Sequence, residues 1–541
     1  MVSKKILVIF LLLLISFPAV KSLFIPGGFT SHDMTHHIVR QISMDKLLSE
    51  GQFPPRWSGE LNNGYGYPVF LFNYPLPALV GEVFHKLGLG YVDSVKAVLF
   101  SSMFMSVLGM YLFLRALLGS RLSAFLGAVF YLYAPIRFIY IYVSASVGSA
   151  LALGILPFVF WALVEVKNGK KWAVWVGGLG LAVLILSHNV TALIFAPVIL
   201  MFAWTIGGTV AIRQMGLMFT LGLGLSAWFW MPATFEAQYT RFGEIFGKFY
   251  QDQFPTIWQL LRSPWGYGLS HPQNPEIGDM SYQLGLVHIG VMLVFSIWYL
   301  VSGRKKIFKL GLFILGSFIL SVFFMLKISE PLWNNLPFLS LIQFPLRFSS
   351  VAIFCASLAA ALLIKYLPFR KILFVVLIIL VIYANRNHWN INQVFDPGED
   401  YYLNLKTTST SYGEHLPKWG KVMDKASSSK LEVIKGDGKL KILKDQSIFV
   451  LAEIEASTAG KVRLNQFYFP GWEIKVDGKK VNFNYLSDGE SYGLPLFDIE
   501  KGKHMVSAEF KNTPVRNLAD LVGLVSVVLW GILLCKLLIR K

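Results

Sequence analysis

Twelve stretches of this sequence are long and apolar enough to cross a membrane as helices. A crossing helix needs about 20 mostly apolar residues. The stretches lie at residues 4–22, 94–115, 121–142, 147–166, 172–187, 190–208, 214–231, 284–302, 307–326, 347–366, 371–386 and 517–537. A soluble domain cannot bury so many apolar segments, so the sequence predicts a polytopic α-helical membrane protein of about 12 spans.

Charge and cysteine content exclude other classes of protein. Charged residues make up 15% of the chain, whereas soluble domains contain about 25%. The formal charge of +18 lies mostly in short loops between apolar stretches, which argues against nucleic-acid binding. The cysteines, Cys355 and Cys535, both fall in apolar stretches, so a disulfide framework is not expected.

Basic clusters predict the orientation in the membrane. With twelve spans and a cytoplasmic N-terminus, every cluster falls on one side, which is the cytoplasmic side by the positive-inside rule. The clusters are Lys4–Lys5, Arg115 with Arg121, Lys167–Lys171, Arg213, Arg304–Lys306, Lys365–Lys371 and Lys536–Lys541. We therefore expect a multi-pass plasma-membrane protein with both termini cytoplasmic and its active face extracytoplasmic. The alternative for the first span is a cleaved signal peptide.

The apolar stretch at residues 69–90 breaks this pattern if it is counted as a span. It contains Pro75, Pro77, Glu82, His85 and Lys86, which make it a poor membrane crosser. We interpret it as an interfacial helix lying on the outer surface.

Five regions follow from this division. Residues 1–22 form the first transmembrane helix, and 23–93 an outer loop with interfacial helices and a candidate catalytic aspartate. Residues 94–386 form a transmembrane bundle with outer loops at 232–283 and 327–346. Residues 387–514 form an extracytoplasmic β-rich domain, and 515–541 the last helix and a basic cytoplasmic tail.

Alternating apolar and polar residues between positions 430 and 512 predict several short strands, as in KLEVIK and WEIKVD. Asp437-Gly438 and Asp477-Gly478 are typical of hairpin turns. We expect a small β-sandwich-like domain before the last span. Its aromatic residues Phe467, Tyr468, Phe469 and Trp472 are expected to form its core, with ligand binding as the alternative.

The first outer loop contains most of the candidate catalytic residues. Thr30 or Ser31 can cap a helix that begins near His32. Asp33, His36, His37 and Arg40 then share one helix face. An ionised Asp in a first helical turn can act as a base or hold a divalent metal. The alternatives are that Asp33 belongs to the helix cap and that both histidines are solvated; a third zinc ligand is not evident.

Further candidates follow along the chain. Arg40, Arg56 and Arg347 can each match a phosphate with a guanidinium fork. Trp57, Tyr65 and Tyr67 suit a headgroup belt or a sugar-stacking face. His188, Asn189 and Glu236 lie at expected outer ends of spans, where ionisable groups need partners. The alternative for Glu236 and Arg347 is a structural ion pair between spans.

The ordered set of motifs resembles a known family. HD..TH at 32–37, PPRW at 54–57, GYGYP at 64–68, SHN at 187–189, SPWGYG at 263–268 and QFPLRF at 343–348 resemble the "6-pyruvoyl-tetrahydropterin synthase-related" membrane proteins. FPGW at 469–472, GKH at 502–504 and TPVR at 513–516 resemble the outer domain of bacterial proteins that glycosylate cell-surface polymers. The family is similar to C-type glycosyltransferases (GT-C fold). The resemblance implies no pterin chemistry.

This resemblance implies an integral membrane glycosyltransferase that moves a sugar from a polyprenyl-phosphate carrier to a lipid-linked or surface-polymer acceptor. It implies Asp33 as the catalytic acid or base, with Arg40, Arg56 and Arg347 on the donor phosphate. The residues expected to shape the site are His36, His37, His188, Asn189, Glu236, Tyr65 and Tyr67. A divalent metal, Mn²⁺ or Mg²⁺, held by Asp33 and His37 stays open. Partners would include membrane lipids and no nucleic acid.

One departure from the family pattern bears on activity. Family members often carry Arg and Glu after a pattern like YIYV at 140–143, where this chain has Ser144 and Ser149. A two-carboxylate site is therefore in doubt. Alternative functions are a flippase or transporter of lipid-linked sugars and a non-catalytic sugar-lipid-binding scaffold.

Overall fold

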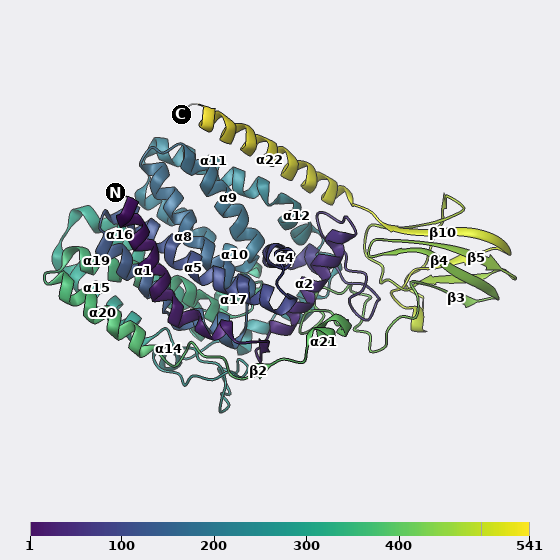
Figure 1. The fold of residues 1–541 in the computed structure, drawn as a ribbon, viewed down its shortest axis with the longest axis horizontal. Helices are drawn as coiled ribbons and strands as arrows, with labels where there is room; N and C mark the ends of the chain where they lie inside the picture. The colour runs from purple at the N-terminus through teal and green to yellow at the C-terminus, as the bar shows by residue number, and fades with distance from the viewer. Residues whose placement is uncertain (1, 488, 540–541) are drawn as a thin grey trace.

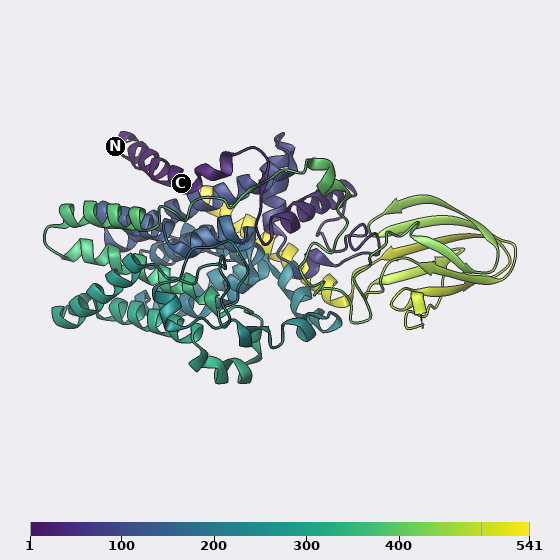
Figure 2. The same cartoon turned by 90° about the horizontal axis from the view of Figure 1, so that it is seen from below.

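The computed structural model describes residues 2–487 and 489–539. It shows a helical bundle with an elongated β domain at one end (Figures 1 and 2). The N-terminal and C-terminal helices begin and end at the far end of the bundle from the β domain. We call the end of the bundle that adjoins the β domain its loop face, because the first loop gathers there.

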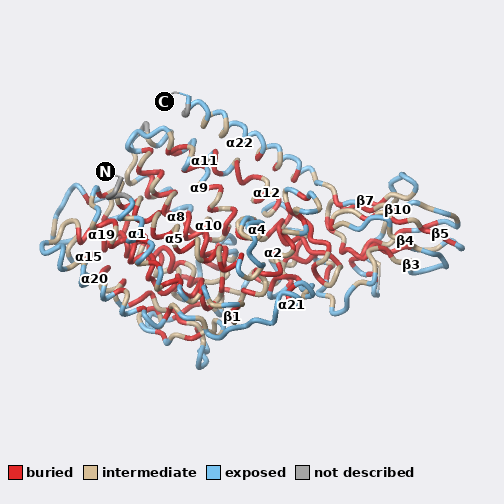
Figure 3. Tube along the Cα trace, in the orientation of Figure 1, coloured by how far each residue is buried: buried red, intermediate tan, exposed pale blue. Residues whose placement is uncertain are grey.

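Seven helical segments in the described residues are long and apolar enough to cross a membrane. The helices in these segments are α1 (Val2–Val20), α5 (Tyr91–Leu118), α8 (Val147–Lys167), α10 (Asn189–Ile206), α16 (Phe308–Met325), α19 (Ser349–Tyr366) and α22 (Pro514–Ile539). α8 and α19 are buried at the centre, whereas α1 and α22 are largely exposed on the periphery (Figure 3). The peripheral helices expose Leu and Ile side chains of the kind that face lipid.

Two further segments are broken. α6 (Arg121–Leu132) and α7 (Pro135–Phe138), with the π-helical turn Ile139–Val143, are bent by 51°, and α11 (Thr209–Leu225) and α12 (Ala227–Phe235) by 71°. Pro135 explains the first break, because proline donates no hydrogen bond and disfavours helix in the preceding residue. Counting each bent pair as one span gives up to nine candidate crossings, by length and composition, in the described part of the chain.

The twelve-span prediction is therefore not confirmed. The remaining predicted spans correspond to α9 (Trp172–Ser187), α15 (Leu286–Ser302) and α20 (Arg370–Ala384). They have 16, 17 and 15 residues, which is at or below the lower end of the range of about 17–25 residues for a bilayer crossing. Hydropathy located each of these helices, with the same bounds for α9 and bounds within two residues for α15 and α20.

The interfacial stretch is divided into two short helices. α3 (Val69–Phe72) and α4 (Leu76–Lys86) are separated by Asn73–Pro75. Neither helix is long enough to cross a bilayer. α4 packs against α5 and α2 (Met34–Ser49), so the stretch supports the start of the first loop helix.

The β domain contains two antiparallel sheets, with strand orders β4-β5-β10-β7-β8 and β3-β6-β9. The strands are β3 (Leu431–Lys435), β4 (Gly438–Gln446), β5 (Phe449–Ala456), β6 (Gly460–Leu464), β7 (Trp472–Val476), β8 (Lys479–Lys480), β9 (Leu496–Ile499) and β10 (Gly502–Phe510). Alternation in the sequence located all of them except β9. Phe467, Phe469 and Trp472 are buried, as expected of core residues.

One of the two predicted hairpin turns is present. Asp477 and Gly478 both have positive φ and join β7 to its partner β8, as a two-residue hairpin turn requires. Asp437-Gly438 instead connects β3 in one sheet to β4 in the other. The hairpin prediction at Asp437-Gly438 is wrong, because β3 pairs with β6 rather than with the next strand along the chain.

Two contacts join the first loop to the chain that follows the bundle. β1 (Gly28–Phe29) pairs with β2 (Val394–Phe395). Trp57 is fully buried among β-domain aromatics, with its ring centroid 5.0 Å from Phe510 and 5.7 Å from Trp472. The indole N–H donates to Gln466 at 2.8 Å. Trp57 therefore holds the β domain to the loop, and the prediction of a headgroup or sugar-stacking role is wrong for this residue.

The second glycine of GYGYP explains how the Trp57 ring fits against the loop backbone. Gly66 has φ +81°, and a Cβ there would lie 2.4 Å from the Trp57 ring. Tyr67, beside it, is also fully buried. The backbone at position 66 can approach the indole this closely only because glycine has no side chain.

Candidate functional site

Asp33 occupies the N-cap position of α2, but its carboxylate does not cap the helix. The hydroxyl of Ser31 accepts the backbone N–H of Met34 at 3.2 Å and takes that role. Within the described residues, the Asp33 carboxylate makes no hydrogen bond or ion pair. The half-buried carboxylate is therefore free to contact a ligand, and the cap interpretation is wrong for its side chain.

The backbone around Asp33 is anchored to two other segments. The N–H groups of His32 and Asp33 donate to the carbonyls of Val143 and Ser144, at 3.2 and 2.9 Å. The His32 ring nitrogen Nε2 lies 2.9 Å from the carbonyl of Gly268. Ala145, after Ser144, has φ +49°, an unfavourable conformation that is more frequent at functional sites. These contacts fix the position from which the carboxylate projects.

The next turns of α2 carry His36, His37 and Arg40. His37 is buried, and burial, with the nearby Arg40 charge, holds its pKa well below the usual range. Burial and Arg40 also lower the pKa of His36, against the opposing charges of Asp33 and Glu414. Arg40 donates from Nε and Nη2 to the carbonyl of Ser409, at 3.1 and 2.6 Å. Neither histidine is a solvated, ordinary imidazole.

Tyr74 lies where the charged groups meet. Burial raises the pKa of Tyr74, and the charges of Arg40, Asp33 and Arg347 all act on its hydroxyl. The Tyr74 ring packs edge-on against His188, with centroids 4.9 Å apart. Tyr74, His37 and Arg40 also line a small cavity between α2, α4 and α5. Sequence reasoning missed Tyr74, although NYPLP at 73–77 places it where the interfacial stretch is interrupted.

His188 is buried between α9 and α10, and its ring has polar contacts with Ser149 and with both the backbone N–H and the hydroxyl of Thr191. Nδ1 accepts the Thr191 backbone N–H at 3.0 Å, so a neutral ring carries its proton on Nε2. Nε2 lies 3.4 Å from the hydroxyl of Ser149. Ser149 thus serves as a partner of His188 rather than as the expected charged residue. Asn189 accepts from the N–H of Val190 at the start of α10.

Arg347 lies in the turn before α19. Its Nη1 donates to the carbonyl of Ile342 at 2.8 Å and to Gln343 at 3.1 Å. The guanidinium lies 5.0 Å from the centroid of the Phe344 ring. Both hydrogen bonds come from one nitrogen, so the other edge of the guanidinium has no partner in the described residues. The structure does not pair Arg347 with Glu236.

Glu414 supplies a second carboxylate that sequence reasoning missed. Its charge acts on His36 and on Tyr67. Its Oε2 is buried without a hydrogen-bond partner in the described residues. Glu414 comes from the segment between α21 (Glu399–Asn404) and β3, far from α2 in sequence. No local pattern marks it, because only tertiary contact brings it to α2.

Arg56 and Glu236 belong to a separate group of ion pairs at the junction with α22. Arg56 donates to Asn512 and pairs with Asp520, with Nη2 and Oδ1 2.5 Å apart. Glu236 pairs with Arg516 at 2.9 Å, and both side chains are almost fully buried. The structural ion pair considered for Glu236 is confirmed, with a different partner. Arg56 has a structural partner too, in place of the phosphate contact predicted for it.

Tyr65 and Tyr67 join the first loop to two later segments, the one after β6 and the one before β3. Tyr65 packs against Phe467, with centroids 6.1 Å apart. The Tyr67 hydroxyl lies 2.9 Å from that of Thr410 and accepts the N–H of His415 at 3.0 Å. Tyr67 therefore contacts the segment that carries Glu414, and the site-shaping role of both tyrosines stays a prediction.

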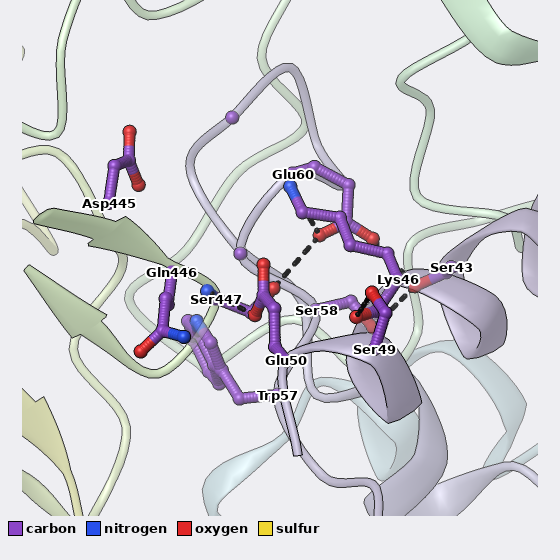
Figure 4. A network of polar contacts seen from close by, with 12 residues as sticks. Ser43, Lys46, Ser49, Glu50, Trp57, Ser58, Glu60, Asp445, Gln446 and Ser447 are labelled. Carbon is purple, nitrogen blue, oxygen red and sulfur yellow. Dashed lines mark hydrogen bonds and ion pairs between the residues drawn. The ribbon is translucent and has the colours of Figure 1, made fainter. Parts of the chain in front are cut away.

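A polar network connects α2 to the β domain (Figure 4). Glu50 accepts the N–H of Ser447, in the turn between β4 and β5, at 2.7 Å. Glu60 accepts the hydroxyl of Ser43 at 2.6 Å and pairs with Lys46 at 3.6 Å. The end of α2 therefore has a fixed position relative to the β domain.

Within residues 2–487 and 489–539, Asp33 and His37 do not converge with a third possible metal ligand. In the part of the chain that the structure describes, a group of three possible metal ligands occurs at His271, Glu276 and Asp279. It lies in the loop whose Gly268 contacts His32. The Mn²⁺ or Mg²⁺ expectation for Asp33 remains a prediction.

Comparisons with known proteins are distant. No family model matches the chain, so the family resemblance rests on the motifs. An uncharacterised protein of Lactococcus lactis subsp. cremoris is 26% identical over 242 residues, which cover 42% of this chain and 38% of that protein. The match thus spans well under half of the curated relative.

Three solved structures show partial similarity. Arabinofuranosyltransferase AftD from Mycobacteria is 13% identical, with a TM-score of 0.41, over 70% of this chain and 26% of that one. The Archaeoglobus fulgidus oligosaccharyltransferase is 12% identical, with a TM-score of 0.40, over 75% and 60%. ArnT from Cupriavidus metallidurans, bound to undecaprenyl phosphate, is 14% identical, with a TM-score of 0.36, over 68% and 60%. Similarity this distant assigns no activity to the chain.

Proposed function

We propose that this protein is an integral membrane glycosyltransferase that acts at the loop face of its bundle. It moves a sugar from a polyprenyl-phosphate carrier to a lipid-linked or cell-surface acceptor. The observation that carries the proposal is the Asp33 carboxylate, which has no capping bond and shares its surroundings at Tyr74 with Arg40 and Arg347. An acid–base group beside phosphate-binding cations is what glycosyl transfer from a phosphate carrier needs.

Asp33 is the proposed base. It takes the proton of the acceptor hydroxyl as that oxygen attacks the anomeric carbon. Its backbone anchors at Ser144 hold the carboxylate in place before the substrate arrives. With a β-linked carrier, direct displacement inverts the anomeric centre.

Arg347 and Arg40 are the proposed phosphate contacts. Arg347 immediately precedes α19, which places it at the end of a crossing helix, at the depth of lipid headgroups. Its hydrogen bonds use Nη1 alone, which leaves one edge of the guanidinium for a phosphate. Arg40 is tied through Nε and Nη2 and offers Nη1. His188 and Tyr74 shape the wall between them.

The side of the membrane on which the loop face lies is also part of the proposal. The basic loop clusters favour an extracytoplasmic loop face, where a membrane-anchored sugar carrier supplies the donor. Glu414 adds a second carboxylate near His36 and so supports a two-carboxylate site without a charge at position 144 or 149.

The test is sugar transfer from a panel of labelled polyprenyl-phosphate sugars to envelope lipids. Wild type and Asp33→Asn are compared, with and without Mn²⁺ or Mg²⁺. Asp498→Asn is the matched control, because that side chain is 84% exposed on the β domain. We expect wild type and the control to turn over and Asp33→Asn to lose at least about 100-fold in rate.

Three results would contradict the proposal. Equal rates of transfer by wild type and Asp33→Asn would show that Asp33 is not the base. Binding of a donor lipid without transfer by wild type favours the scaffold, and movement of labelled lipid across vesicles favours the flippase.

A further inference from the structure

We propose that His271, Glu276 and Asp279 form a binding site for one zinc ion in the loop between α14 (Ile257–Leu261) and α15. One ligand atom from each residue lies within 4.8 Å of the others. An imidazole nitrogen and carboxylate oxygens are ligand types that zinc takes, and a water can fill the fourth position of a tetrahedral site. This site is separate from Asp33 and does not depend on the proposed transfer reaction.

The closest pair has the spacing of two ligands on one metal. His271 Nδ1 lies 3.2 Å from Oδ2 of Asp279. Tetrahedral zinc with bonds of about 2.0 Å places neighbouring ligand atoms about 3.3 Å apart. The pair therefore needs little rearrangement to hold a shared ion.

Asp279 is the ligand for which a cation matters most. Its side chain is only 9% exposed. Its contacts in the described residues are with the His271 ring and the backbone N–H of Glu276. A buried carboxylate is costly unless it is paired, and a divalent ion would place two positive charges beside it.

The surrounding loop lacks regular structure that could hold it. Residues 262–285 form neither helix nor strand. The loop folds back on itself through the N–H of Gly268, which donates to the carbonyl of Gly278 at 2.7 Å. Gly266 makes this approach possible, because a Cβ there would lie 2.1 Å from the same carbonyl. The three ligands close the far end of this fold-back, where a metal is an effective constraint.

The loop also contacts the start of α2. The carbonyl of Gly268 lies 2.9 Å from His32 Nε2, next to Asp33. A metal that closes the loop at His271–Asp279 would therefore hold one of the contacts that position Asp33. The role is a positioning one, because the ligands themselves do not touch the proposed reacting groups.

The experiment measures zinc bound per chain in the purified full-length protein. The protein is stripped with EDTA, dialysed against ZnCl₂ and analysed by emission spectroscopy. Glu276→Gln is the main variant, because the Glu276 side chain is exposed and makes no hydrogen bond or ion pair in the described residues. Its metal-free melting temperature should equal that of wild type, which separates metal loss from misfolding.

We expect wild type to bind one more zinc per chain than Glu276→Gln at a zinc concentration that just saturates wild type. Loss of a ligand should weaken affinity at least about 100-fold, since changes to groups behind the ligands already cost about 10–100-fold. Zinc should raise the melting temperature of wild type more than that of the variant.

His504→Gln is the matched control. His504 Nδ1 lies 2.8 Å from Asp477, so it forms a similar His–Asp pair without a convergent third ligand. This variant should keep the wild-type zinc content. Equal zinc content in wild type and Glu276→Gln would overturn the proposal, as would loss of zinc in His504→Gln alone. A site that takes Ca²⁺ in preference to Zn²⁺ would overturn the assignment of the metal.

Discussion

The backbone N–H of Asp33 donates to the carbonyl of Ser144 at 2.9 Å. The proposed base is thus held by a main-chain group at a position where the family pattern predicted a charged side chain. The contact uses no side-chain atom of Ser144, whose hydroxyl donates to Ile139. The departure at position 144 therefore leaves the anchoring of Asp33 intact.

Gly148→Ala should displace Tyr74. A Cβ at Gly148 would lie 2.2 Å from the Tyr74 ring and 2.7 Å from the backbone carbonyl of Ser187. Since the carbonyl cannot move cheaply, the Tyr74 ring must shift away from position 148 and so change its packing on His188. We expect transfer to fall at least about 10-fold, because misplacing site groups by about 1 Å can cost about 100-fold. Gly216→Ala is the control, because a Cβ there meets open space; equal loss in both variants would contradict the role of Tyr74.

Glu414→Gln should slow sugar transfer without lowering thermal stability. Oε2 of Glu414 is buried without a partner, so removing the charge relieves a desolvation cost. We expect unchanged or slightly raised thermal stability together with at least about 10-fold slower transfer. Glu455→Gln, at an exposed position, should change neither quantity. A marked fall in melting temperature for Glu414→Gln would instead indicate a structural role.

Glu236→Gln should destabilise the contact between α12 and α22. Removing one partner of a buried ion pair leaves the other charge uncompensated, at a cost of about 3–5 kcal/mol. Arg516 is fully buried, donates to Glu236 through Nε, and has Nη2 2.9 Å from the same carboxylate oxygen. The melting temperature in detergent should fall clearly for Glu236→Gln and recover in the double variant Glu236→Met, Arg516→Met. Wild-type stability in the single variant would show that the pair contributes little.

Stability should decrease as the pH falls from about 6.5 towards 4. Burial lowers the pKa of His415 from 6.5 to about 4. The folded state then binds fewer protons than the unfolded state in this window, so folding loses up to about 3 kcal/mol by the lower limit. His37, whose pKa is also well below 6.5, acts in the same direction.

The measurement is the melting temperature as a function of pH for wild type and His415→Phe. Phenylalanine suits the site, since the ring of His415 stacks on those of Phe72 and Phe242. The variant should show a shallower decline between pH 6.5 and pH 4. Identical slopes would mean that His415 does not titrate on unfolding.

The sequence by itself determined the helical bundle, the strands and α2 with Asp33 at its start, because apolar runs, alternation and capping residues act over a few positions. It could not determine where two of the predicted spans are bent, because breaks such as the one at Pro135 depend on neighbouring helices. Only the tertiary structure decided the roles of charged residues whose partners lie far along the chain. Arg56 meets Asp520 across 464 positions and Glu236 meets Arg516 across 280. Glu414 likewise reaches His36 only once the loop and the β domain have packed together, because a charge finds its partner through the fold and not through its neighbours in sequence.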